Sequence, residues 1–122
     1  MKFEFDNNIP IYIQLVEQLK IYIISGKIMP GDRLPSVRDF ALQLKVNPNT
    51  LQKALSELED LKLIYTERTN GKFVTTDQKL IDMYKKKYAF QLSKKYFSSM
   101  KDIGFNEKEI VQYIIDMEGD EL

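Results

Sequence analysis

The chain has few side chains that could carry out covalent chemistry. It contains no cysteine and no histidine among 122 residues, which excludes thiol nucleophiles, disulfides, zinc sites built from Cys or His, Ser-His-Asp triads and histidine pH switches. Catalysis would have to rest on Asp, Glu, Lys, Ser or Tyr, and no acid/base pair of these types stands at a recognisable spacing. We therefore expect no enzyme, no cofactor and no bound metal.

Length and composition indicate one ordinary domain, or one small domain with an appendage. Apolar residues make up 43% and charged residues 30% of the chain, which is enough for a packed core and excludes a disordered polypeptide. Residues 1–6 are too polar for a signal peptide, and no apolar run approaches the roughly 18 residues of a membrane span. These features predict a cytoplasmic protein with no membrane partner.

The charges balance overall but are unevenly distributed. The chain has 18 basic and 18 acidic side chains. Residues 79–101 contain seven lysines against Asp82, whereas residues 102–122 contain seven acidic residues against Lys108. This complementarity predicts that the two stretches lie against each other, within one chain or between two.

Two of the predicted helices are joined by a short turn. Apolar spacing over residues 10–25 predicts a first helix, and Ser36 is a suitable N-cap for a second helix of about nine residues. Asn47 at the N-cap, followed by Pro48 at the first helical position, is the strongest helix-start signal in the sequence. A turn of three to four residues between the second and third helices indicates a helix-turn-helix.

A β-hairpin is expected directly after the third helix. Residues 64–67 and 72–75 are rich in β-branched and aromatic side chains, and the segment between them ends in Asn70-Gly71. Asn-Gly is a strong signal for a hairpin turn. A hairpin in this position is a wing, so residues 1–76 are predicted to form a winged helix-turn-helix domain.

The remaining residues, 77–122, are predicted to form a helical dimerisation tail. A helix over 77–103 would extend roughly 40 Å at 1.5 Å per residue, which is more than a small winged domain can cover. A further helix begins at Asn106, with Glu109 completing a capping box. The fold class is therefore mainly α. The apolar residues expected at the dimer interface are Leu80, Met83, Tyr84, Tyr88, Phe90, Leu92, Tyr96, Phe97, Ile110 and Ile114, although the aromatic ones could instead line a ligand pocket.

Several motifs together resemble a known family. These are Ile9-Pro10-Ile11-Tyr12, residues 26–38 with the segment Pro-Gly-Asp-Arg-Leu-Pro-Ser, residues 46–55 and residues 70–74. Over roughly residues 9–76 the sequence resembles the winged-helix DNA-binding domain of GntR-type bacterial repressors. The short tail, with Asn-Pro-Asn-Thr at the third helix, resembles the YtrA-type subfamily, whose members often repress operons for ABC transporters.

The resemblance implies which residues contact a double-stranded DNA operator. Arg38 and the start of the third helix would approach the major groove, and the wing tip the minor groove. The residues expected to bind DNA are Ser36, Arg38, Asn47, Pro48, Asn49, Thr50, Gln52, Lys53, Asn70, Gly71 and Lys72. Asn and Gln can pair bidentately with adenine and Arg with guanine. Many relatives carry arginines at positions 48–49 and 52–53, so their operator sequences cannot be transferred to this chain.

The sequence therefore predicts a homodimeric repressor that reads an inverted repeat, in the promoter of its own operon. An activator is not distinguished from a repressor, and no effector is identified. The alternative is a winged-helix module that binds other proteins and no DNA. The zero net charge predicts a shallower dependence of DNA affinity on salt than strongly basic DNA-binding proteins show.

Overall fold

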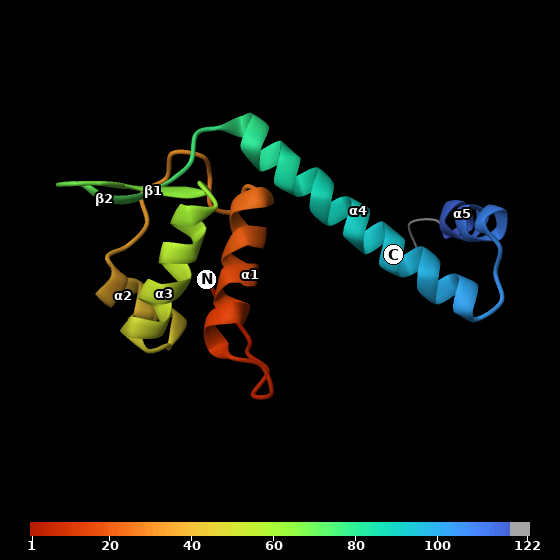
Figure 1. Cartoon of the computed structure of the whole chain (residues 1–122), viewed down its shortest axis with the longest axis horizontal. Helices are drawn as coiled ribbons and strands as arrows, with labels where there is room; N and C mark the ends of the chain where they lie inside the picture. The colour runs from red at the N-terminus through yellow and green to blue at the C-terminus, as the bar shows by residue number, and fades with distance from the viewer. Residues whose placement is uncertain (118–122) are drawn as a thin grey trace. The chain divides into compact units, whose positions relative to one another are not determined.

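The computed structural model describes residues 1–117, which fold into helices and one antiparallel hairpin (Figure 1). In chain order the elements are α1 (Ile11–Ile24), α2 (Val37–Leu44), α3 (Pro48–Asp60), β1 (Ile64–Glu67), β2 (Gly71–Val74), α4 (Gln78–Asp102) and α5 (Glu107–Asp116). The predicted fold class, a mainly helical winged helix-turn-helix with helices after the wing, is confirmed. The last part of the acid-rich stretch, residues 118–122, lies outside the described residues.

The first of two compact units, Met1–Lys85, contains the main hydrophobic core. Helices α1 and α3 lie side by side (Figure 1) and contribute Leu15, Leu19, Leu51 and Leu55, while α2 contributes Phe40. All five side chains are essentially inaccessible to solvent. Their spacing of three or four residues within each helix produces one apolar stripe per helix, so the three helices enclose a single core.

Local capping interactions fix where the helices begin. Asn47 Oδ1 accepts a hydrogen bond from the Asn49 backbone N–H at 2.8 Å, and Ser36 Oγ accepts one from the Asp39 N–H at 3.2 Å. At α5, Asn106 and Glu109 form the complete reciprocal capping box. Each cap satisfies a backbone donor that the first helical turn leaves free.

The hairpin differs from the prediction at its tip. Glu67 pairs with Gly71, so the tip consists of residues 68–70, and Gly71 belongs to β2 instead of the turn. Gly71 has φ +98°, a conformation that glycine adopts without the steric cost of a Cβ atom. A three-residue tip followed by such a glycine is a common alternative to the two-residue Asn-Gly turn.

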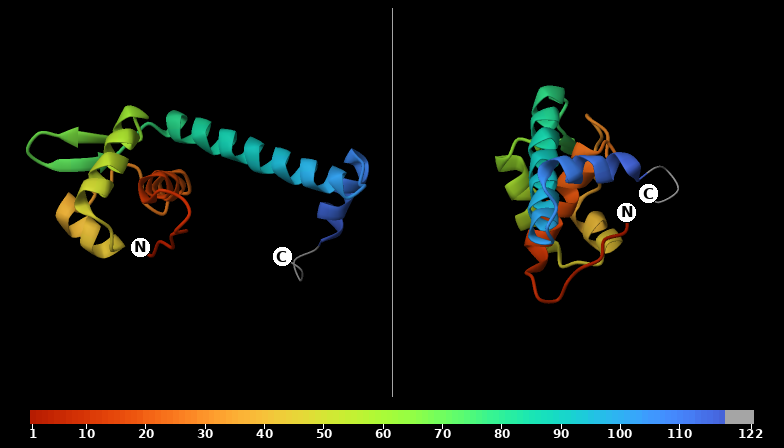
Figure 2. Two further views of the ribbon diagram at one scale, coloured as in Figure 1. Left: turned by 60° about the horizontal axis from the view of Figure 1, so that its bottom comes forward. Right: turned by 90° about the vertical axis from the view of Figure 1, so that its right-hand side faces the viewer.

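The chain before α2 pairs with the hairpin through a single isolated bridge. Arg33 forms an antiparallel bridge with Phe73. The Leu34 N–H donates to the Lys72 carbonyl at 2.8 Å, and the Val74 N–H donates to the Asp32 carbonyl at 2.8 Å. The extended Arg33-Leu34 segment is therefore fixed to the wing, and the hairpin extends away from the helices of this unit (Figure 2).

The second compact unit begins at Lys86, within α4. This boundary lies later than the predicted one between residues 76 and 77. The reason is that Leu80, Ile81 and Tyr84, in the first turns of α4, pack against the core of the first unit. Among residues 1–117 no helix is both long and apolar enough to cross a bilayer.

Inside the second unit, few side chains are buried. Ile110 on α5 is fully buried, and the rings of Phe105 and Tyr113 meet edge to face with centroids 6.0 Å apart. Within the described residues, one ion pair joins the basic and acidic stretches, between Lys101 Nζ and Glu107 Oε1 at 3.1 Å. Both partners are exposed, so this pair contributes at most about 1 kcal/mol.

Candidate nucleic-acid interface

The turn between α2 and α3 determines the direction in which α3 leaves α2. Lys45 ends α2 in the left-handed conformation, with φ 57° and ψ 47°. The Val46 N–H then bonds back to the Ala41 carbonyl at 3.0 Å, which is the pattern of a Schellman closure. Asn47 caps α3 immediately afterwards and Pro48 occupies its first turn. Helix α3 therefore begins at a point fixed by backbone geometry on both sides.

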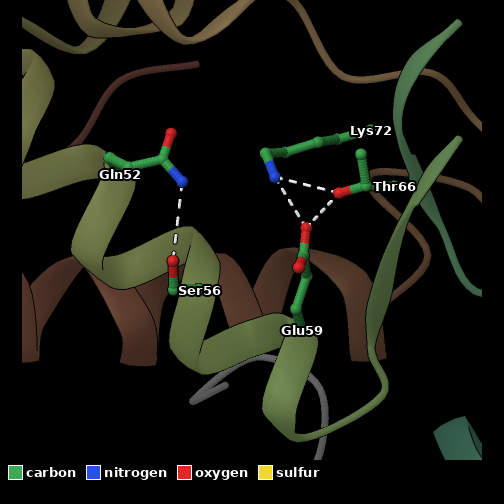
Figure 3. A network of polar contacts seen from close by, with 5 residues as sticks. All are labelled: Gln52, Ser56, Glu59, Thr66 and Lys72. Carbon is green, nitrogen blue, oxygen red and sulfur yellow. Dashed lines mark hydrogen bonds and ion pairs between the residues drawn. The ribbon is translucent and has the colours of Figure 1, made fainter. Parts of the chain in front are cut away.

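One face of α3 is polar and free of the core. Leu51, Leu55 and Leu58 are buried on the opposite face, whereas Asn49 and Gln52 are exposed. Within residues 1–117, the Gln52 amide makes only a long hydrogen bond, 3.5 Å, to Ser56 Oγ one turn further along (Figure 3). Both amide side chains can thus turn toward an external partner.

The remaining predicted residues at the start of α3 have partly structural roles. The side-chain oxygen of Asn47 is occupied by the cap, which leaves its NH₂ group for another partner. Pro48 is exposed and has no backbone N–H, while Thr50 is half-buried. The structure therefore brings Asn47, Pro48, Asn49 and Thr50 together in one turn, with the amide groups as its main hydrogen-bonding side chains.

Lys53 has an aromatic partner within the same chain. Its Nζ atom lies 3.9 Å from the centroid of the Tyr12 ring on α1. A lysine over a tyrosine face is stabilised by about 0.5–1 kcal/mol at an exposed position. The sequence prediction placed Lys53 at the DNA interface without anticipating this contact.

A polar network ties the wing to the end of α3 (Figure 3). Lys72 Nζ on β2 donates to Glu59 Oε1 on α3 at 2.6 Å and to Thr66 Oγ1 on β1 at 3.0 Å. The Thr66 hydroxyl also donates to Glu59. Hydrogen bonds from Lys72 and then Thr66 lower the pKa of Glu59 below its ordinary value of 4.5, against a smaller opposing effect of burial. The carboxylate is therefore ionised at neutral pH and restrains the wing relative to α3.

Lys72 is one of the predicted DNA-binding residues. In this network its ammonium group is already paired with the Glu59 carboxylate. At the wing tip, the Asn70 side-chain amide donates to Glu67 Oε2 at 3.1 Å, and the backbone at Gly71 carries no side chain. The tip therefore exposes backbone and the neighbouring side chains of Arg68 and Thr69.

The start of α2 adds one more predicted group. Ser36 is exposed and serves as the N-cap, and Arg38 is exposed in the first turn that follows. None of the ion pairs formed by residues 1–117 includes Arg38. Its guanidinium group is available to a nucleic acid.

Sequence reasoning missed Arg33. This exposed arginine lies on the strand-like segment bound to β2, close to the wing glycine. A Cβ atom at Gly71 would lie 3.5 Å from Arg33 Nε. The extended Arg-Leu-Pro sequence predicts the local conformation, but the pairing with β2 is a tertiary contact that the local pattern does not contain.

The predicted dimer residues divide into two groups. Leu80 and Tyr84 are half-buried against the first unit's core, and Ile110 is fully buried in the second unit. These three side chains are largely used within their own chain. The others keep accessible surface: Met83, Tyr88, Phe90, Leu92, Tyr96, Phe97 and Ile114.

A helix-turn-helix followed by a wing defines a class of proteins, the winged-helix transcriptional regulators. Residues 11–74 match the family model described as "Bacterial regulatory proteins, gntR family". The chain belongs to this family of DNA-binding transcriptional regulators, which are not enzymes. No group of three acidic side chains within residues 1–117 is arranged to hold a metal ion.

Two curated relatives illustrate the similarity. The chain is 35% identical to the uncharacterized HTH-type transcriptional regulator YhcF of Bacillus subtilis over 114 residues, which is 93% of this chain and 94% of that one. It is 43% identical to the HTH-type transcriptional repressor YtrA of Bacillus subtilis over 70 residues, covering 57% of this chain and 54% of the relative. The resemblance to YtrA-like short regulators is confirmed, and that to YhcF extends over nearly the whole chain.

Solved structures agree with this assignment. A GntR family transcriptional regulator from Listeria monocytogenes superposes with a TM-score of 0.84 at 38% identity, over 93% of this chain and 100% of that one. A crystal structure of AraR(DBD) in complex with operator ORX1 superposes with a TM-score of 0.54 at 26% identity, over 62% and 95%. A homologous DNA-binding domain therefore binds operator DNA.

Proposed function

We propose that the protein is a homodimeric repressor that acts in the cytoplasm and reads an inverted-repeat operator. The observation that carries the proposal is the exposed amide face at the start of α3, held between a fixed turn and a wing that is bonded to the same helix. An operator in its own promoter, next to ABC transporter genes, is the target that the YtrA resemblance favours.

Base reading is assigned to a small set of side chains. Asn49 and Gln52 offer amides that can pair bidentately with adenine in the major groove. Arg38, on the adjoining α2, offers a guanidinium that can pair with guanine or with phosphate. Asn70 and Gly71 bring the wing backbone toward the minor groove. Lys53 and Lys72 contribute less charge to this surface, since each already has an intramolecular partner.

The second unit supports the dimer. Phe90 and Leu92 are each 67% exposed, and Ile103 is 71% exposed. Val111, Ile114 and Ile115 on the last helix are also exposed. So many large apolar side chains on a unit of this size mark an interaction surface. We assign a second copy of the chain as the partner, because the lysine-rich residues 79–101 and the acid-rich residues 102–122 follow one another along the chain and can pair between copies.

Two-fold symmetry then fixes the form of the operator. A symmetric dimer presents two identical α3 helices, and each reads one half-site. The half-sites are inverted repeats whose centres lie about one helical turn or more apart. Repression follows from occupancy of promoter DNA.

Gel-shift or fluorescence anisotropy measurements with the purified full chain test the proposal. The duplex from upstream of its own gene is expected to bind more tightly than a scrambled duplex at moderate salt. Gln52→Ala is expected to weaken the specific complex by about 1–3 kcal/mol. Gln112→Ala is a matched control, because Gln112 also bonds one turn along its own helix, to Asp116 at 2.8 Å, but lies on α5.

Two results would contradict the proposal. Equal affinity for the upstream and scrambled duplexes would remove sequence-specific binding and favour the protein-interaction module. A monomer at micromolar concentration in sedimentation would remove the dimer.

A further inference from the structure

A cavity of about 370 Å³ lies between the chain segment that leads into α2 and the wing. Residues 33–37 form one wall, and residues 66–69 with Gly71 and Lys72 form the other. The hydrogen bonds between Leu34 and Lys72 and between Asp32 and Val74 hold the two walls together. The cavity is therefore part of the folded first unit, because the backbone of one wall is hydrogen-bonded to the backbone of the other.

The cavity is lined by more cations than anions. Arg33, Arg68 and Lys72 contribute positive charges, and Glu67 is the acidic residue of the lining. Lys72 is ion-paired with Glu59, outside the cavity, and Glu67 accepts a hydrogen bond from Asn70. Neither Arg33 nor Arg68 takes part in an ion pair among residues 1–117.

The position of the Arg33 guanidinium is defined by the wing. A Cβ atom at Gly71 would lie 3.5 Å from Nε and 3.7 Å from Nη2 of Arg33, so the guanidinium lies along the backbone at a position without a side chain. Leu34, the next residue, is buried, which directs Arg33 to the opposite, exposed side of the strand. The arginine is thus held at the base of the wing tip.

We propose that this cavity binds a backbone phosphate of operator DNA, with Arg33 as the main contact and Arg68 as the second. The inference rests on the proposed function, because it requires that the wing and α3 approach a duplex together. A guanidinium fits a phosphate better than an ammonium does, since its planar donors match two phosphate oxygens. The contact anchors the wing without reading sequence, because phosphate contacts carry no base information.

The test compares Arg33→Gln with wild type in DNA binding over a range of salt concentrations. We expect the variant to lose about tenfold in affinity at low salt, equally for the upstream duplex and for a scrambled duplex. The slope of log affinity against log salt is expected to fall by about one for each half-site occupied. The ratio of the two affinities should stay constant.

Lys27→Gln is the matched control. It removes the same charge from an exposed position in the turn after α1, outside the cavity lining. Its salt slope is expected to remain closer to that of wild type than the slope of Arg33→Gln. Arg68→Gln, at the wing tip and away from the core, provides a second variant that leaves the strand bonded to β2 intact and should show a smaller loss of the same kind.

Three outcomes separate this inference from the proposed function. Unchanged affinity and slope in both arginine variants would overturn the phosphate site, even where wild type prefers its upstream duplex. A loss confined to the upstream duplex would also overturn it, because it would indicate a base contact. If wild type shows no preference between the duplexes, the repressor proposal fails, but a reduced slope in Arg33→Gln still supports a phosphate site.

Discussion

The two units of the chain bury their apolar side chains to very different extents. In the first unit Phe40, Leu51 and Leu55 are within 1% of complete burial, as are most side chains on the inner faces of three helices. In the second unit Ile110 is the fully buried large side chain among the described residues, while Phe90 and Leu92 remain 67% exposed. The first unit has a closed core of its own, whereas the described part of the second unit leaves many of its large apolar side chains exposed. This difference supports the proposal that the first unit binds DNA and that the second joins two copies of the chain.

The largest effect is expected for Phe40→Ala. The ring is completely buried in the core of the first unit, and removal of such a side chain costs about 3–5 kcal/mol through lost burial and a residual cavity. Urea denaturation followed by circular dichroism should show the loss at every protein concentration. A change below about 1 kcal/mol would mean that the core of the first unit is not closed as described.

Phe90→Ala makes the same chemical change in the second unit with a different result. Because the ring is exposed within one chain, its removal should leave the first unit's unfolding unchanged and weaken the proposed dimer by about 1–2 kcal/mol, roughly five- to thirtyfold in dimer Kd. Sedimentation equilibrium measures this. Leu42→Ala is the control, since Leu42 is 71% exposed but belongs to α2. Equal effects of the two substitutions would remove the distinction between the units.

Glu59→Gln tests how the wing is held within the first unit. The lowered pKa of Glu59 means that its contribution to stability is present above the unfolded value, near pH 4.5, and disappears as the pH falls through the lower folded value. At pH 7 the variant should lose about 1 kcal/mol, and below pH 4.5 the difference from wild type should shrink.

Denaturation at several pH values measures that difference. Glu57→Gln, which alters an exposed neighbour on α3, provides the matched control. A constant gap between wild type and Glu59→Gln from pH 7 to pH 3 would contradict an ionic link between Glu59 and Lys72.

The smallest effect is expected at the ion pair of the second unit. Lys101 and Glu107 are 49% and 75% exposed, and pairs of this kind contribute at most about 1 kcal/mol. Lys101→Ala should therefore change the free energy of unfolding and the free energy of dimerisation each by less than about 0.5 kcal/mol. A larger loss would show that Lys101 also pairs with acidic residues of a second copy.

Features that depend on neighbours in sequence were predictable. The caps at Ser36, Asn47 and Asn106 form as the residue types indicate, because a capping side chain reaches backbone donors only two or three residues away. At Ser36 the cap is the hydrogen bond that the serine hydroxyl accepts from the Asp39 N–H. Short polar side chains thus determined where α2, α3 and α5 begin.

Features that depend on tertiary contact were not predictable. Three such contacts join residues that are distant in sequence. They are the pairing of Arg33 with Phe73, the contact of Lys53 with the Tyr12 ring and the packing of Leu80 on the core of the first unit. The hairpin tip falls between these cases. Asn70-Gly71 identifies a hairpin, but the pairing of Glu67 with Gly71 depends on how the strand meets the Arg33 segment and α3.

The contact between Lys53 and Tyr12 has a consequence for selectivity. To reach a phosphate, Lys53 must first leave the aromatic ring, so its net contribution to DNA affinity is the difference between two interactions of similar size. The protein's own surface thereby competes with the nucleic acid for one cation. Under the proposed role of the α3 amides, such competition would weaken attraction to every duplex alike without affecting the amide contacts, so a larger fraction of the binding free energy would depend on the bases.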